Sequence, residues 1–145
     1  MFTNRWRSAS LMLVAISIVA LPSCSGGGGT SAATSPGSTA QALKQPATAA
    51  QVATNMRKID QISKQIAESA GTNKAKAASL DAQLEPAWMP IEDTVKGNDQ
   101  NIYLAMEDNF AVLEKAADEG NAAEAAKGSA GITSAVQPYL AKYSG

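Results

Sequence analysis

Apolar side chains recur at alternating spacings of three and four along residues 52–143, which is the period of amphipathic α-helices. Four such stretches are separated by glycines. No stretch alternates apolar and polar residues in the manner of a β-strand, so no strand is predicted. The apolar stripes are Val52, Met56, Ile59, Ile66 and Ala70, then Leu84, Trp88, Ile91 and Val95, then Tyr103, Met106, Phe110, Leu113 and Ala117, and finally Ala125, Ile132, Val136, Tyr139 and Tyr143.

Start and stop signals place the ends of these predicted helices. The first helix begins at the capping box of Thr48 and Gln51 and stops at Gly71, and the second begins near Asn73 and ends at Lys96, before Gly97. The third is capped by Asp99 and stops at Gly120, and the fourth begins at Asn121. Amphipathic helices joined by short loops favour an all-α fold, a small antiparallel four-helix bundle. Pro86 and Pro90 are expected to cause either a bend within the second helix or a restart of it. Gly128 and Gly131 are expected to allow close contact between helices.

The first 24 residues have the pattern of a lipoprotein signal. Arg5 and Arg7 precede an apolar run over residues 11–21, which is too short for a mature span of roughly 20 residues and typical of a secretory signal peptide. Residues 21–24 read Leu-Pro-Ser-Cys, which resembles the lipobox of bacterial lipoproteins. The resemblance implies cleavage before Cys24 and diacylglycerol on its sulfur. The alternative is an ordinary signal peptide followed by a chance cysteine.

This reading divides the chain into three parts. Residues 1–23 are the predicted lipoprotein signal peptide, and residues 24–47 are the lipidated cysteine with a flexible tether rich in Gly, Ser, Thr and Pro. Residues 48–145 form the predicted four-helix bundle domain. A chain of this composition has a reach of roughly 25–30 Å. The predicted location is the extracytoplasmic face of the cell membrane or outer membrane, with the membrane as a partner through the lipid on Cys24.

Composition excludes several kinds of chemistry. The chain has no histidine and a single cysteine, Cys24. Ser-His-Asp and Cys-His nucleophiles, nearly all zinc sites, c-type haem attachment and the usual di-iron bundle site are therefore excluded. The formal net charge is −1, and no basic stripe predicts a nucleic-acid partner. We therefore expect a protein that is not an enzyme and has no resident cofactor, apart from a possible hard cation.

Four glutamates are predicted to share one edge of the bundle. With Trp88 and Phe110 at heptad position a, Glu85 and Glu92 fall at position e of the second helix, and Glu107 and Glu114 fall at position e of the third. These helices are joined by a short loop and should be antiparallel neighbours. One interpretation is a solvated acidic face. The other is an all-oxygen cation site for calcium or iron, because hard cations accept carboxylate ligands without histidine.

Residues 84–143 resemble helical segments of extracytoplasmic bacterial iron-uptake proteins, including the imelysin-like type. The resemblance is carried by residues 84–117 and by the later segment AVQPYLAKY. The G-x-H-x-x-E signature of the imelysin-like proteins is absent, because the chain has no histidine. The resemblance implies an extracytoplasmic helical module linked to metal uptake.

Two functions are expected from these patterns. The first is a membrane-anchored extracytoplasmic lipoprotein that acts as a non-enzymatic interaction or accessory module with an unknown protein partner. The second is a cation-binding lipoprotein linked to metal uptake, with Glu85, Glu92, Glu107 and Glu114 as its ligands.

Overall fold

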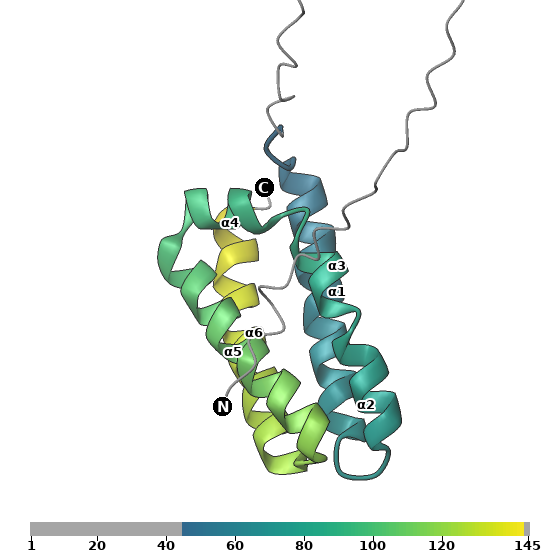
Figure 1. Ribbon diagram of the computed structural model, residues 1–145. Helices are drawn as coiled ribbons and strands as arrows, with labels where there is room; N and C mark the ends of the chain where they lie inside the picture. The colour runs from purple at the N-terminus through teal and green to yellow at the C-terminus, as the bar shows by residue number, and fades with distance from the viewer. Residues whose placement is uncertain (1–44, 144–145) are drawn as a thin grey trace, which may run out of the picture. The chain divides into compact units, whose positions relative to one another are not determined.

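The computed structural model describes residues 45–143, and every regular element in this range is a helix (Figure 1). The helices are α1 (Ala49–Ser69), α2 (Lys74–Asp81), α3 (Leu84–Trp88), α4 (Glu92–Asn98), α5 (Gln100–Glu119) and α6 (Ala122–Tyr143). The prediction of an all-α fold is therefore confirmed for this part of the chain. The predicted signal peptide, Cys24 and the tether up to residue 44 lie outside the described residues.

Local capping signals form as the sequence predicts. The Thr48 side chain accepts a hydrogen bond from the Gln51 backbone N–H at 3.2 Å, and the Gln51 side chain accepts one from the Thr48 N–H at 2.9 Å. The Asp99 side chain caps α5, and Gly120 ends it in the left-handed conformation with φ of 73°. These caps satisfy backbone groups that have no partner within the helix. The predicted boundaries of α1 and α5 are confirmed.

In the predicted second segment, from Asn73 to Lys96, Pro86 and Pro90 favour a bend or a restart of the helix, and the structure shows restarts. Asn73 caps α2, but the chain then forms three short helices instead of one. Pro86 occupies the first turn of α3, where its missing N–H costs no helical hydrogen bond, and Pro90 lies between α3 and α4. The two prolines therefore act as restarts of the helical chain. Gly97 is not a stop, because α4 continues to Asn98.

The longest helices pack side by side around an apolar core. Helix α6 contacts both α1 and α5, and α2 also contacts both α1 and α5, while α3 packs on α1 and α4 packs on α5. The turn after α1 and the turn after α5 lie at the same end of the domain (Figure 1). The largest fully buried side chains include Trp88, Phe110, Met56, Ile59, Ile66, Leu84, Ile91 and Met106. Most residues of the apolar stripes therefore lie in the core, whereas Tyr103 and Tyr143 are half-buried.

Two glycines bring α5 and α6 close together, as expected. A Cβ atom on Gly128 would lie 3.0 Å from Leu113 Cγ, and one on Gly131 would lie 1.9 Å from Asn109 Oδ1. Both distances are shorter than van der Waals contact, so larger residues at these positions require the helices or their side chains to move. The glycines thus set the separation of α5 and α6.

Candidate functional site

Trp88 joins α3 to α5 at the centre of the candidate site. Its side chain is 1% exposed, and its indole N–H donates a hydrogen bond to Glu107 Oε1 at 2.7 Å. Its ring stacks on Tyr103 with centroids 6.2 Å apart and meets the edge of Phe110 at 5.4 Å. The predicted assignment of Trp88 to the core is confirmed. The carboxylate of Glu107 is thus held by an uncharged hydrogen-bond donor, the indole N–H.

Tyr103 makes a second connection, between α5 and α4. Its hydroxyl donates to Glu92 Oε1 at 3.4 Å, and Lys96 Nζ lies 4.9 Å from the centroid of its ring. A cation over an aromatic face is attracted by the ring quadrupole. Two predicted glutamates, Glu92 and Glu107, are therefore each bound to an aromatic side chain.

Glu85, Glu92 and Glu107 form what we call the carboxylate cluster. The pKa of Glu85 is raised above its ordinary value, first by burial and then by the negative charges of Glu92 and Glu107. Like charges that share a site disfavour ionisation. Glu114 does not contribute to this shift. It lies seven residues beyond Glu107, which is about 10 Å along the helix axis. The structure thus brings three of the four predicted glutamates close enough to interact.

The carboxylate cluster is not arranged as a metal centre in the structure. Over residues 45–143, no group of three or more Asp, Glu, Cys or His side chains is placed to hold a metal ion. One oxygen of Glu107 and one of Glu92 accept hydrogen bonds from Trp88 and Tyr103. A cation would need the carboxylates to turn toward one another. The predicted ligand set of Glu85, Glu92, Glu107 and Glu114 stays a prediction.

The raised pKa of Glu85 gives a prediction about pH. An acid whose pKa is higher in the folded than in the unfolded state lowers stability as the pH rises through that interval. Glu85→Gln should therefore raise the free energy of unfolding at neutral pH. We expect a gain of about 0.5 kcal/mol or less, because Glu85 is exposed and solvent screens its charge. The gain should vanish well below pH 4.5, the ordinary value of this carboxyl.

Urea unfolding curves of the wild type and Glu85→Gln, recorded at neutral and acidic pH, measure this effect. Asp108→Asn is the matched control, because Asp108 is also exposed, lies in the middle of α5 and does not contribute to the shift of Glu85. A gain that is equal for both variants, or equal at both pH values, would contradict the electrostatic origin of the shift.

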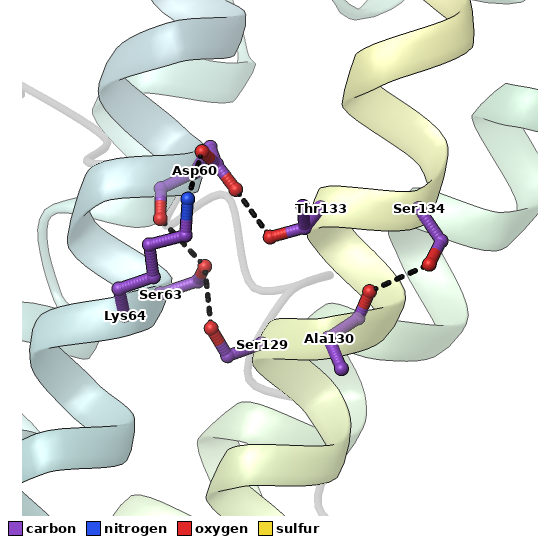
Figure 2. Close-up of polar contacts among 7 residues, drawn as sticks. All are labelled: Asp60, Ser63, Lys64, Ser129, Ala130, Thr133 and Ser134. Atoms are coloured by element: carbon purple, nitrogen blue, oxygen red, sulfur yellow. Dashed lines mark hydrogen bonds and ion pairs between the residues drawn. The ribbon is translucent and has the colours of Figure 1, made fainter.

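A second group of polar side chains lies between α1 and α6, and sequence analysis did not predict it. We call it the polar seam: Asp60 and Ser63 on α1 with Ser129 and Thr133 on α6 (Figure 2). Thr133 Oγ1 donates to Asp60 Oδ1 at 2.6 Å, and the buried hydroxyls of Ser63 and Ser129 lie 3.2 Å apart. Small polar residues at helical spacing, three and four positions apart, are the sequence signal that could have identified it.

Asp60 also has a partner on its own helix. Lys64 Nζ forms an ion pair with Asp60 Oδ2 at 2.7 Å, so both carboxylate oxygens of Asp60 are bonded. Ser63 Oγ in addition donates to the Asp60 carbonyl at 2.8 Å. Because hydrogen bonds to charged groups are the stronger ones, Asp60 fixes the register of α1 against α6.

A shallow hollow opens on the outer side of the polar seam. It is lined by Lys64, Ala67, Glu68, Ala126, Ser129, Ala130, Thr133 and Ser134. Three of these eight side chains are alanines, three carry hydroxyl groups and two are charged. We call this surface the seam hollow.

The last residues before α1 also contact the helical domain. The Ala47 N–H donates to Thr94 Oγ1 on α4 at 2.9 Å, and Pro46 and Ala47 lie against Pro90 and Asp93 around a small pocket. The chain therefore enters the domain alongside the start of α4.

Comparison of the chain with protein-family models, curated proteins and solved structures finds no match in any of the three. Within the described residues, no helix combines the length and the apolar character that crossing a membrane requires.

Proposed function

We propose that the protein is a lipoprotein held at a membrane through lipid on Cys24. The observation that carries the proposal is the sequence Leu-Pro-Ser-Cys at residues 21–24, which directly follows a basic and then apolar signal segment. Cys24 is also the only cysteine of the chain. Each buried methylene adds about 0.8 kcal/mol of membrane affinity, so two or three acyl chains anchor a protein stably. The proposed location is the extracytoplasmic face of the cell membrane or outer membrane.

The helical domain is, in this proposal, a non-enzymatic interaction or accessory module. The lack of histidine supports this role, because it removes the commonest general base and metal ligand. The polar seam supports it too, since its side chains bond to one another and stabilise the packing of α1 on α6. We also infer that α2, α3 and α4 together take the place of one helix in an antiparallel four-helix bundle.

Replacing Cys24 with serine tests the anchor. The wild-type protein should sediment with membranes and require detergent for extraction, whereas Cys24→Ser should appear in the soluble fraction or remain as an uncleaved precursor. Ser25→Ala is the matched control, because it changes the neighbouring residue and leaves the acceptor sulfur intact. Mass spectrometry of the wild-type N-terminus should show a diacylglycerol-sized addition on Cys24. Membrane attachment of a cleaved, unlipidated Cys24→Ser chain would overturn the proposal.

A second candidate function is carboxylate-based binding of iron or calcium, linked to metal uptake. It is favoured by the mutual electrostatic effect of Glu85, Glu92 and Glu107. A bound cation would relieve the repulsion among these glutamates. The resemblance of residues 84–143 to helical segments of iron-uptake proteins points in the same direction.

Thermal unfolding of the full chain in detergent, with calcium, manganese or iron added, tests this second function. Saturation at 100 times Kd stabilises a protein by about 2.7 kcal/mol, so binding should raise the melting temperature clearly. Glu85→Gln combined with Glu107→Gln should abolish the rise. Glu114→Gln shows whether the fourth predicted glutamate takes part. If no cation raises the melting temperature, or the rise survives the double substitution, this candidate is wrong.

A further inference from the structure

A binding partner could cover the seam hollow with little loss of free energy from burying its hydroxyl groups. Its hydroxyl groups are bonded within the domain: Ser129 to Ser63, Thr133 to Asp60, and Ser134 to the Ala130 carbonyl at 2.9 Å (Figure 2). Burying a hydroxyl is costly only when its hydrogen bond is lost. A partner placed over the hollow would therefore leave no unsatisfied hydroxyl behind.

Besides these hydroxyl groups, the hollow is lined by three alanines, whose side chains are small. Ala126 and Ala130 are exposed on α6, and Ala67 is half-buried on α1. Alanines on a helix surface let the backbone of another helix approach closely. The hollow therefore fits a helical partner better than a small molecule.

The charges along the α1 side of the hollow favour a second copy of this chain as the partner. Lys64 and Glu68 lie one turn apart on α1, and both line the hollow. A copy of α1 that runs antiparallel over this helix, about a two-fold axis near Ala67, brings Lys64 opposite Glu68 of the second copy. The same axis brings Glu68 opposite Lys64 of the second copy. The charge pattern is thus complementary to itself, as an isologous interface requires.

The register of the seam extends this geometry to α6. Asp60 faces Thr133 and Ser63 faces Ser129, so α1 and α6 run antiparallel, and Ala67 lies level with about Ala126. The same two-fold axis therefore passes close to Ala126. In the dimer, α6 lies antiparallel over α6 of the second copy, with alanines at the contact.

We propose that the seam hollow is the interface through which two copies of this chain associate. The proposal rests on the proposed function, because a common lipid anchor confines the copies to one surface and raises their effective concentration. An interface of small side chains is expected to be weak in free solution. Anchoring at a membrane therefore raises the fraction of chains that are dimeric, even when the interface is weak.

Cross-linking of the full chain in isolated membranes tests the interface. In Ala126→Cys, the new thiol is the only free one, because lipid occupies the sulfur of Cys24. A short bis-maleimide should convert this variant to a product of twice the chain mass. Ala82→Cys is the matched control, because Ala82 is also exposed but lies at the end of α2, outside the hollow.

Charge reversal then tests the pairing in the Ala126→Cys background. Glu68→Lys and Lys64→Glu should each lower the dimer yield about fivefold, because by symmetry each change alters two contacts. Lys64→Glu together with Glu68→Lys should restore the yield. Glu68→Lys is the safer single change, because Lys64 also pairs with Asp60. Circular dichroism of each variant checks that its helices are retained.

Three results would overturn the dimer: equal cross-linking of Ala126→Cys and Ala82→Cys, a yield that Glu68→Lys does not lower, or a product whose mass identifies a different protein. Failure of the lipid anchor is recognised separately. In that case, the wild-type chain itself reacts with a maleimide at Cys24.

Discussion

Trp88→Ala is expected to lower the free energy of unfolding by about 3–5 kcal/mol, which is the usual cost of truncating a buried aromatic side chain. Trp88 is 1% exposed and packs against Tyr103 and Phe110. It also holds the five-residue helix α3 on α5 through Glu107. Domains of this size are stable by only about 5–15 kcal/mol, so the variant should be close to unfolding at physiological temperature.

The conservative variant separates packing from hydrogen bonding. Trp88→Phe keeps an aromatic ring in the core and removes the indole N–H, so it should cost clearly less than Trp88→Ala. Urea unfolding followed by far-ultraviolet circular dichroism measures both variants. Tryptophan fluorescence cannot follow unfolding of these variants, because Trp88 is the only tryptophan of the predicted mature chain and both substitutions remove it. A loss below about 1 kcal/mol for Trp88→Ala would mean that α3 does not depend on this side chain.

Gly128→Leu should also destabilise the domain strongly. A Cβ atom at Gly128 would already lie 3.0 Å from Leu113 Cγ and 3.2 Å from Val112 Cγ1. A full leucine side chain therefore forces α5 and α6 apart, and overpacking of this kind costs about 1–3 kcal/mol. The higher helix propensity of leucine offsets less than about 1 kcal/mol of this loss.

Gly97→Leu provides the matched control. Gly97 lies in α4, and a Cβ atom there meets nothing within 4 Å. The same substitution should therefore stabilise the domain slightly through helix propensity alone. We expect the two variants to differ by about 1–3 kcal/mol in urea unfolding, because the gain in helix propensity is common to both and cancels. Equal effects would show that the contact between α5 and α6 is not the cause.

The carboxylate cluster could be predicted in part from heptad positions. Assigning Glu85, Glu92 and Glu107 to one edge anticipated their interaction, because a helix surface repeats every seven residues. The heptad repeat also grouped Glu114 with them. In the structure, the charges of Glu92 and Glu107 raise the pKa of Glu85, whereas Glu114 does not contribute. The carboxylates of Glu107 and Glu92 are oriented by hydrogen bonds from Trp88 and Tyr103. A heptad position gives the side of the helix on which a residue lies, but not its hydrogen-bond partner.

The polar seam was beyond sequence reasoning for a different reason. Ser63 lies within an apolar stripe, and its partner Ser129 is 66 positions away. A serine in a helix can bond to its own backbone, to water or to another helix. Ser63 bonds both to the Asp60 carbonyl of its own helix and to Ser129, and only the packing of α1 on α6 provides the second of these partners.

The sequence by itself determined the helical class, the helix caps and the core stripes, because caps and helical periodicity depend on residues within a few positions of one another. Thr48, Asp99 and Gly120 act within a single turn, and Trp88 and Phe110 fall at core positions of their own helices. Tertiary structure decided the rest. It set the hydrogen bond of Trp88 to Glu107 and the pairing of Asp60 with Thr133. These features depend on which helices become neighbours, and that choice is made by packing the whole core at once.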